Sequence, residues 1–302
     1  MRILGSTLSI SQRSLLPEHP PSAEQEEAQR LSHLLIQNYS ARHAVAEALS
    51  FVQQRTPCQL SEDLSHVVFS LSTDPLSQFQ VPAEYGVKGG VAREALAAAL
   101  RLRPPREPRD IDLVRKGRHR VPDDEEIARR LMPRDFLHGA RVELIRDMSA
   151  YLSSRDLTIN ELAVIDDRLS ASLVCVLDTI GGVLRPSRYR GGTLHKKPSV
   201  GGQSLLKMVR LYAEGACAGE SWTLMGIPDQ VAFSEFDLAV HLNKSFQRGR
   251  AVAERFLHTC TLLSLVAACP NLVSETLEEL GHLRHGERGL FPDVPASEWR
   301  SE

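Results

Sequence analysis

The sequence is poor in aromatic residues and lacks the cysteine patterns of several common protein classes. Aromatic side chains make up 5% of its 302 residues, and its five cysteines include no Cys-x-x-Cys pair. An odd number of cysteines without that spacing argues against a disulfide framework or a zinc site and is typical of reduced thiols. We therefore expect a cytoplasmic protein.

Long apolar runs and an excess of charge of one sign are also missing. No apolar run reaches the roughly 18 residues of a membrane span, so no membrane partner is expected. The net charge is −2, so any basic surface that binds nucleic acid must be local. Residues 1–17 contain two arginines, several serines and no acidic residue. An organelle-targeting segment therefore stays open as an alternative there.

The order of sequence patterns predicts three regions. Over 1–80 we expect an N-terminal helical extension, with Ser22 and Gln25 in a capping-box pattern. Strand and helix patterns are mixed over 81–195, including a solvated helix at "DDEEIARRLM". This mixture predicts an α+β domain with a small mixed sheet. After a basic, glycine-rich stretch, 196–302 is expected to be a helical C-terminal domain.

Two aspartates, Asp110 and Asp112, stand one residue apart in the alternating segment "DIDLV". Residues i and i+2 of a strand point to the same face, so both carboxylates project together. Like charges this close repel each other unless a cation lies between them, and Mg²⁺ uses such oxygen ligands together with phosphate oxygens. The alternative is a pair of surface aspartates beside arginines.

A glycine pair, Gly89 and Gly90, precedes a helix pattern that begins near Val91. Glycine allows the backbone to approach a phosphate, and a helix N-terminus favours anions. Arg93 lies in the first turn, where it can reach the same anion or remain solvated. The glycine turn and the aspartates therefore indicate a site for a metal-bound phosphate.

A third carboxylate is available at Glu143, which alternates with Val142 and Leu144 in "ARVELIR". On a strand it faces opposite to those two residues. If that strand lies beside the Asp-Ile-Asp strand, Glu143 completes a two-metal site of the kind used in nucleotidyl transfer. An exposed strand glutamate is the alternative.

The segment "SSRDLTINELAV" gives these patterns a specific resemblance. Arg155, Asp156 and Asn160 follow the glycine pair, Arg93 and Asp-x-Asp in the order found in the tRNA CCA-adding enzymes and bacterial poly(A) polymerases. Asp178 with Gly181 and Gly182 also resembles the Asp-x-x-Gly-Gly turn of that family. The resemblance covers roughly 85–215, less than half of the chain.

The resemblance implies a polymerase-β-like nucleotidyltransferase head with a helical neck. It further implies that Mg²⁺ ions bind at Asp110 and Asp112. A nucleoside triphosphate would be held by Gly89, Gly90 and Arg93, in a pocket shaped by Arg155, Asp156 and Asn160. The implied partners are that triphosphate and an RNA 3′ end, with tRNA as the expected acceptor.

The sequence departs from this family in the neck. Gln203, Ser204 and Lys207 stand where the family has the Glu-Asp pair and arginine that select CTP or ATP, and only Arg210 matches a family arginine. These side chains offer different hydrogen-bond donors and acceptors, so strict CCA addition is not expected. Lys207 is a candidate to contact a base carbonyl, or a solvent-facing lysine.

Taken together, the patterns predict a nucleotidyltransferase that depends on two Mg²⁺ ions. A related alternative keeps the chemistry and changes the acceptor to a protein, a small molecule or another nucleotide. A third hypothesis is a catalytically silent module that binds RNA or nucleotide. Converging carboxylates favour catalysis, because a silent site has no physical need for them. The base added, the acceptor and the oligomeric state stay open.

Overall fold

The structure is a computed structural model that describes residues 8–9, 20–37, 41–77, 81–106, 111–131, 142–187, 198–227, 230–263 and 265. The chain divides into two compact units. We call the first the sheet unit, which comprises Pro21–Val183 and Ser187–Arg190. The second, the helical unit, comprises Met1–Pro20, Leu184–Pro186 and Gly191–Glu302.

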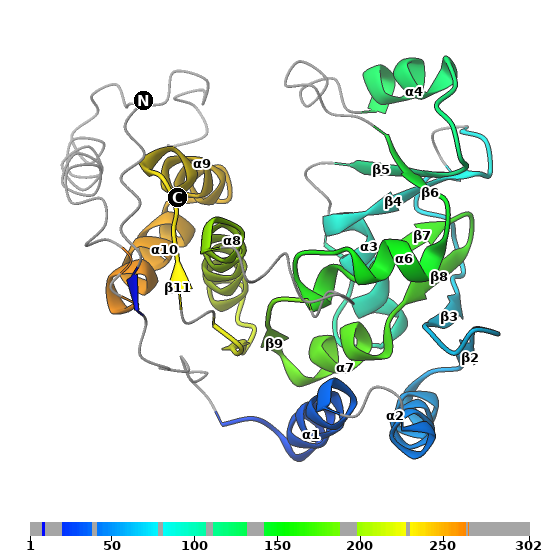
Figure 1. Cartoon of the computed structure of the whole chain (residues 1–302), viewed down its shortest axis with the longest axis horizontal. Helices are drawn as coiled ribbons and strands as arrows, with labels where there is room; N and C mark the ends of the chain where they lie inside the picture. The colour runs from blue at the N-terminus through cyan, green and yellow to red at the C-terminus, as the bar shows by residue number, and fades with distance from the viewer. Residues whose placement is uncertain are drawn as a thin grey trace. The chain divides into compact units, whose positions relative to one another are not determined.

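The sheet unit combines helices with short strands (Figure 1). Its elements in chain order are α1 (Ala23–Gln37), α2 (Arg42–Arg55), β2 (Gln59–Leu60), β3 (Val67–Ser70), β4 (Tyr85–Lys88), α3 (Gly89–Ala99), β5 (Asp112–Lys116), α4 (Asp123–Leu131), β6 (Glu143–Ile145), α6 (Met148–Ser153), the 3₁₀ helix η2 (Thr158–Asn160), β7 (Leu162–Ile165), β8 (Arg168–Ala171) and α7 (Leu173–Gly181). Strand β9 (Val183–Leu184) follows. The α+β class predicted from the sequence is confirmed.

A seven-stranded mixed sheet in the order β2-β3-β8-β7-β4-β5-β6 forms the middle of this unit. Strands β4 and β5 are antiparallel, whereas β5 and β6 are parallel. The register places Lys88 opposite Asp112 and Val114 opposite Glu143. Paired residues, and alternate residues of one strand, share a face of the sheet. Lys88, Asp112 and Glu143 therefore project from one face, where β4 ends and β5 and β6 begin.

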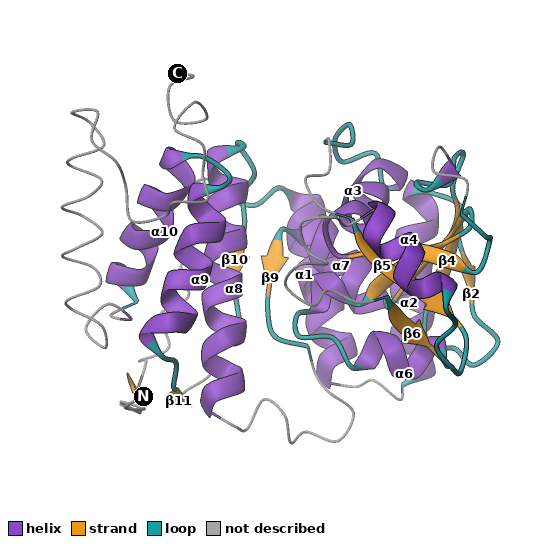
Figure 2. Cartoon of the chain, turned by 90° about the horizontal axis from the view of Figure 1, so that it is seen from above, coloured by secondary structure: helices purple, strands orange, loops and turns teal. Residues whose placement is uncertain are grey.

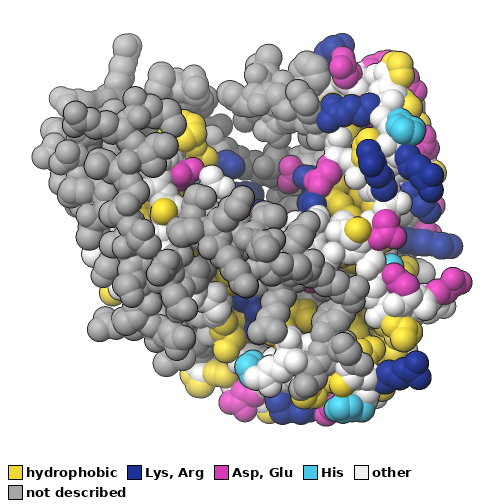
Figure 3. Space-filling view, viewed as in Figure 1, with side chains coloured by type: hydrophobic (Ala, Val, Ile, Leu, Met, Phe, Trp, Pro, Cys, Tyr) yellow, Lys and Arg dark blue, Asp and Glu magenta, His cyan; other side chains and the backbone are white. Residues whose placement is uncertain are grey.

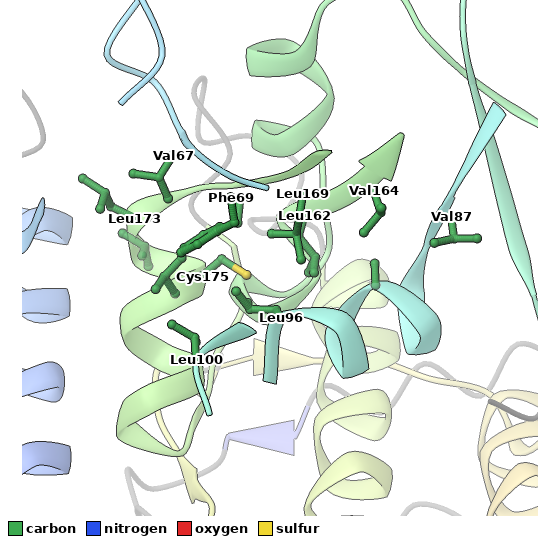
Figure 4. Packing of buried hydrophobic residues seen from close by; sticks show 14 of the residues in the cluster. Val67, Phe69, Val87, Leu96, Leu100, Leu162, Val164, Leu169, Leu173 and Cys175 are labelled. Carbon is green, nitrogen blue, oxygen red and sulfur yellow. The ribbon is translucent and has the colours of Figure 1, made fainter. Parts of the chain in front are cut away.

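The opposite face of the sheet carries the main apolar core. Helices α3 and α7 cover it, and α1 and α2 pack against α7. In Figure 4, Phe69 of β3 lies close to Leu173 and Cys175 of α7, with Leu96 of α3 and the C-cap residue Leu100 on the same side of the sheet. Burying each large side chain of this kind contributes about 1.5–3 kcal/mol, so this layer fixes the sheet firmly.

Helix α6 covers part of the face that carries the charged residues. Tyr151 and Leu152 of α6 pack against Val114, Ile145 and Ala163 in a second, smaller apolar cluster. Figure 2 shows α3 and α6 on opposite sides of strands β4 to β6. The charged residues thus lie beside a rigid apolar patch.

The helical unit is built on helices that pack against one another (Figure 2). Its elements are β1 (Leu8–Ser9), α8 (Pro198–Cys217), β10 (Thr223–Leu224), β11 (Gln230–Val231), α9 (Glu235–Phe246) and α10 (Arg250–Leu262). Strands β1 and β11 pair in antiparallel register. Within the described part of the chain, every helix is too short or too polar to cross a membrane.

The N-terminal region contains the predicted helix cap and packs on the rest of the sheet unit. Ser22 and Gln25 form the predicted capping box, with the Ser22 N–H donating to Gln25 Oε1 at 2.9 Å and the Gln25 N–H to Ser22 Oγ at 3.2 Å. However, β2 and β3 join the sheet, and α1 packs on α7. The N-terminal helices and these two strands therefore lie in the same compact unit, Pro21–Val183, as the rest of the sheet.

The helix predicted to be solvated, α4, is partly buried. Its Asp124 is 6% exposed and accepts hydrogen bonds from the Tyr85 hydroxyl at 2.8 Å and from Arg115 Nε at 2.6 Å. Ile127 and Ala128 are buried beside it. The surrounding acidic and basic residues masked this short apolar stripe in the sequence.

Candidate functional site

A glycine turn joins β4 to α3 and lies directly against Asp112. Gly89 has φ +61°, which favours glycine, and a Cβ added to it would overlap Asp112 Oδ2. At Gly90, no atom of the described residues lies within 4 Å of the corresponding position. Lys88, the N-cap residue, makes no side-chain cap hydrogen bond to α3. The first turn of α3 therefore lies beside a carboxylate, and its backbone N–H groups are of the kind that bind anions.

The structure describes two of the three predicted carboxylates. Asp112 is exposed at the start of β5. Asp110, its predicted companion, lies outside the described residues. Glu143 lies on β6 beside β5, as the alternation predicted, and its side chain shares the face of Asp112.

The Glu143 carboxylate is held by two cationic side chains. Lys88 Nζ donates to Glu143 Oε2 at 2.6 Å. Arg155 donates through Nη2 to Oε1 at 2.6 Å and through Nη1 to Oε2 at 3.1 Å. Burial works to raise the pKa of Glu143, but the hydrogen bonds from Arg155 and Lys88 outweigh it and hold that pKa below its ordinary value. Glu143 is therefore ionised at neutral pH.

Tyr151 supports this pair from α6. The Arg155 guanidinium lies over the Tyr151 ring, 4.0 Å from its centroid, in a cation–π contact that fixes its orientation. Burial raises the pKa of Tyr151, so the phenol stays neutral. Its hydroxyl is buried and has no hydrogen-bond partner within the described part of the chain. The Glu143–Arg155 pair is thus packed against a rigid aromatic base.

Arg93, Asp156 and Asn160, which the sequence placed in one pocket, do come together. Arg93 Nη1 donates to Asn160 Oδ1 at 2.6 Å, and Asn160 Nδ2 donates to Asp156 Oδ1 at 2.8 Å. The Leu157 N–H also donates to Asp156 Oδ1, at 2.9 Å. This chain of bonds ties the first turn of α3 to the segment around η2, so the arginine is held in place at the helix N-terminus.

Asp178 of α7 holds the η2 segment through buried hydrogen bonds. It is fully buried and accepts hydrogen bonds from Thr158 Oγ1 of η2 and Ser32 Oγ of α1, both at 2.6 Å. Gly182, which ends α7, has φ +62° in the left-handed region. The Asp-x-x-Gly-Gly pattern therefore has a structural basis, because it links η2, α1 and the end of α7.

Some polar residues near the site are not predicted by the sequence patterns. Lys88 is one, although its place before the glycine pair on an alternating strand could have suggested it. Glu94, which directly follows Arg93, pairs with Arg103 and accepts a hydrogen bond from the Arg106 N–H at 3.0 Å, and so holds the start of the spacer after α3. Glu161 is 8% exposed, and burial raises its pKa to about 7 despite hydrogen bonds from Ser172 and Ser187.

The neck residues of the prediction belong to the helical unit, on α8. Ser204 is buried, which does not suit a residue that reads a base edge, and Gln203 Nε2 donates to Asp237 Oδ1 at 3.3 Å. Arg210 pairs with Glu214 on the same helix. Burial and the positive charges of Arg210, Lys244 and Lys207 lower the pKa of His241 to about 3. Lys207 and Arg210 thus contribute to a basic cluster around a neutral histidine.

A divalent cation fits one part of this arrangement better than another. Among the described residues, no group of three or more His, Cys, Asp or Glu side chains is placed to hold a metal ion. The exposed Asp112 carboxylate beside the glycine turn suits a hard cation. The Glu143 carboxylate already has two cationic partners. A cation therefore fits poorly at Glu143, where it would compete with those two donors.

Comparison with known proteins adds little. No model of a protein family and no curated protein sequence matches the chain. One solved structure similar to it is described as the complex structure of a CCA-adding enzyme with CTP, at 13% identity, 89% coverage of this chain, 68% coverage of that chain and a TM-score of 0.36. A likeness of this size assigns no role to any residue, so the function has to be argued from the site itself.

Proposed function

We propose that the protein is a nucleotidyltransferase that binds a nucleoside triphosphate at the N-terminus of α3. The observation that carries this is the contact between the glycine turn and Asp112. Gly89 places a carboxylate against the backbone of a helix N-terminus, and Gly90 leaves room for an anion in front of it. A phosphate and a carboxylate repel each other there unless a cation joins them.

The residues of the chain then have distinct roles. Asp112, with Asp110, would hold Mg²⁺, which supplies charge neutralisation at the phosphate when it is bound. The backbone N–H groups at Gly89 and Gly90 would receive phosphate oxygens. Arg93, oriented by Asn160 and Asp156, would add a fixed positive charge. Nucleotidyl transfer asks a protein mainly for positioning and charge stabilisation, and these groups provide both.

The acceptor in this proposal is an RNA 3′ end, with tRNA as the first candidate. This acceptor is inferred from the resemblance of the sequence motifs. The charge of the surface in view does not add support, because it is mixed. On the face shown in Figure 3, Lys and Arg side chains are interspersed with Asp and Glu over the region of α4 and β5. The substitutions at Gln203, Ser204 and Lys207 favour addition of one kind of nucleotide over an ordered C, C, A series.

One observation favours the silent binding module as a second candidate. Both oxygens of Glu143 accept hydrogen bonds from cationic side chains, so a three-carboxylate metal site would require Lys88 or Arg155 to move. A protein that only binds nucleotide has no need of that third ligand. The two candidates make opposite predictions for turnover.

The test is incorporation of each labelled nucleotide into total RNA with Mg²⁺, comparing the wild type with Asp112→Asn. We expect the variant to lose activity by about a hundredfold or more, because the charge that holds the cation is gone. Asp123→Asn is the matched control, since Asp123 is exposed on α4. Wild-type turnover in Asp112→Asn would overturn the proposal, and binding without incorporation in the wild type would establish the silent module.

A further inference from the structure

The turn that joins β5 to α4 (Figure 1) is rich in basic side chains, and we call residues 116–121 the basic turn. Its lysine, arginine and histidine residues are all exposed: Lys116, Arg118, His119 and Arg120. Arg146, which directly follows β6, is exposed as well. The Gly117 N–H donates to the Ile145 carbonyl at 3.0 Å. The end of β6 therefore brings Arg146 next to the basic turn.

A buried arginine holds the backbone of the basic turn from inside. Arg115 is 6% exposed and donates through Nη2 to the His119 carbonyl. Asp124 accepts hydrogen bonds from Arg115 Nε at 2.6 Å and from the Val121 N–H at 3.0 Å. A Cβ added to Gly117 would overlap Arg115 Nη1. The backbone therefore wraps closely around the guanidinium group, and the basic side chains are held at the surface.

The cations of the basic turn differ from exposed arginines that have a local counter-charge. Arg250, for example, pairs with Glu254 at 2.8 Å. Within the described part of the chain, no lysine or arginine of the basic turn forms an ion pair, and neither does Arg146. The acidic first turn of α4, which begins at Asp123, limits this positive surface to the turn and the end of β6. A concentrated positive charge of this kind attracts a polyanion.

We infer that the basic turn and Arg146 bind the phosphate backbone of an RNA, away from the glycine turn. Lys116 ends the strand that Asp112 begins, so the two lie about 13 Å apart at roughly 3.3 Å per residue. Four stacked nucleotides span about the same distance, at roughly 3.4 Å each. An RNA whose 3′ end lies at the glycine turn can therefore reach the basic turn with a more distant phosphate. The choice of RNA rests on the proposed function.

The composition of the basic turn favours phosphate over other contacts. It contains no Phe, Tyr or Trp, and Val121 is its one apolar side chain. Segments that insert into membranes and the centres of protein interfaces use aromatic and other apolar side chains. Stacking of single-stranded bases also needs aromatic side chains. Contacts made by this turn should therefore be with the RNA backbone and should not depend on the base sequence.

The experiment measures binding of the full chain to a labelled RNA hairpin with a single-stranded 3′ end, by fluorescence anisotropy without nucleotide. The double variant Arg118→Gln with Arg120→Gln should bind roughly tenfold more weakly at low salt. Between roughly 50 and 200 mM salt, its plot of log affinity against log salt should be less steep by about 2, because two phosphate contacts are lost.

Two further double variants distinguish charge from structure. Arg118→Lys with Arg120→Lys keeps both charges and should stay within about threefold of the wild type, because lysine also binds phosphate. The matched control is Arg42→Gln with Arg168→Gln, which removes two exposed arginines from α2 and β8. It should change the affinity by less than about twofold, because these arginines lie outside the basic turn.

Several outcomes would overturn the inference. They are an unchanged affinity and salt dependence in the Arg118→Gln, Arg120→Gln variant, an equal loss in the control, and a loss that changes when the hairpin sequence is replaced. If that variant lost binding to vesicles of anionic lipid and kept binding to RNA, the turn would be a membrane contact instead.

Incorporation of labelled nucleotide into the same hairpin, measured in parallel, separates the inference from the proposed function. If the wild type binds the hairpin through the basic turn and incorporates no nucleotide, the proposed function fails and the RNA-binding surface stands. If the wild type does not bind the hairpin, the inference fails, whatever the result for incorporation.

Discussion

Two charged clusters arise from the same pair of strands, β4 and β5, and lie on opposite faces of the sheet. Tyr85 and Arg115 project from one face and meet Asp124 of α4. Lys88 projects from the other face, as Asp112 does, and meets Glu143 of β6. Each cluster joins a carboxylate to an arginine. They differ in what surrounds the pair.

The cluster around Asp124 is sealed. The side chains of Arg115 and Asp124 are each 7% exposed, and the Tyr85 hydroxyl satisfies the same carboxylate. The Glu143 side chain, in contrast, is 33% exposed. The same pairing of a carboxylate with an arginine is thus enclosed on the closed face and partly exposed to solvent on the open face.

The largest expected effect concerns the sealed cluster. Asp124→Asn leaves the buried Arg115 charge without a counter-charge, which should lower the free energy of unfolding by about 3–5 kcal/mol. Urea unfolding followed by circular dichroism measures this loss. Asp123→Asn, at the exposed neighbouring position, should change it by less than about 0.5 kcal/mol. If both variants lost the same free energy of unfolding, Asp124 would not be a buried partner of Arg115.

A third carboxylate, Glu161, extends the comparison because its hydrogen-bond donors are hydroxyls and not cations. Ser172 Oγ and Ser187 Oγ donate to it at 2.5 and 2.6 Å. Burial raises its pKa to about 7. A raised acid pKa means that the folded state holds a proton that the unfolded state releases near pH 4.5. Its stabilisation is therefore complete below about pH 4.5 and falls as the pH rises to 7.

We expect Glu161→Gln to remove that dependence. The wild type should lose a few kcal/mol of unfolding free energy between about pH 4.5 and 7 from this group alone, whereas the variant should lose much less. Urea unfolding across this range gives both curves, and their difference isolates Glu161 from other titrating groups. Parallel curves would mean that Glu161 is ionised in the folded protein and that its burial is relieved by water.

The sequence predicted those parts of the site that depend on local order. The glycine pair, a strand that contains Asp112 and the strand that carries Glu143 follow from turn chemistry and alternation over a few residues. Lys88 and Glu143 are 55 positions apart and Tyr85 and Asp124 are 39 apart. Such pairs depend on the order of the strands in the sheet. The spacing of residues within one segment does not determine that order.

The boundary of the sheet unit was harder to predict for a related reason. Strand β2 has two residues and β3 has four, which is too short for alternation to distinguish a strand from a loop. Val67 and Phe69 become recognisable as core residues only because β3 pairs with β8. Long-range pairing, and not local propensity, therefore places residues 59–70 in the sheet.

The smallest expected effect concerns the open cluster and completes the comparison. Glu143→Gln removes the charge that Lys88 and Arg155 share, but water reaches this cluster and screens what remains. We expect a loss of about 1 kcal/mol or less in the free energy of unfolding at pH 7. Because the pKa of Glu143 lies below its ordinary value of 4.5, this contribution is complete above about pH 4.5 and disappears as the pH falls through the lowered pKa.

Urea unfolding of Glu143→Gln and Asp124→Asn, at pH 7 and again near pH 3, measures how much free energy of unfolding each variant loses. The two losses compare the two faces of the sheet. Both variants replace a carboxylate that pairs with arginine by its amide, so the change in covalent structure is matched. A loss in Glu143→Gln as large as that in Asp124→Asn would show that Glu143 is a packing residue. Lys88 would then be part of the fold, and its charge would not be available to a ligand at the glycine turn.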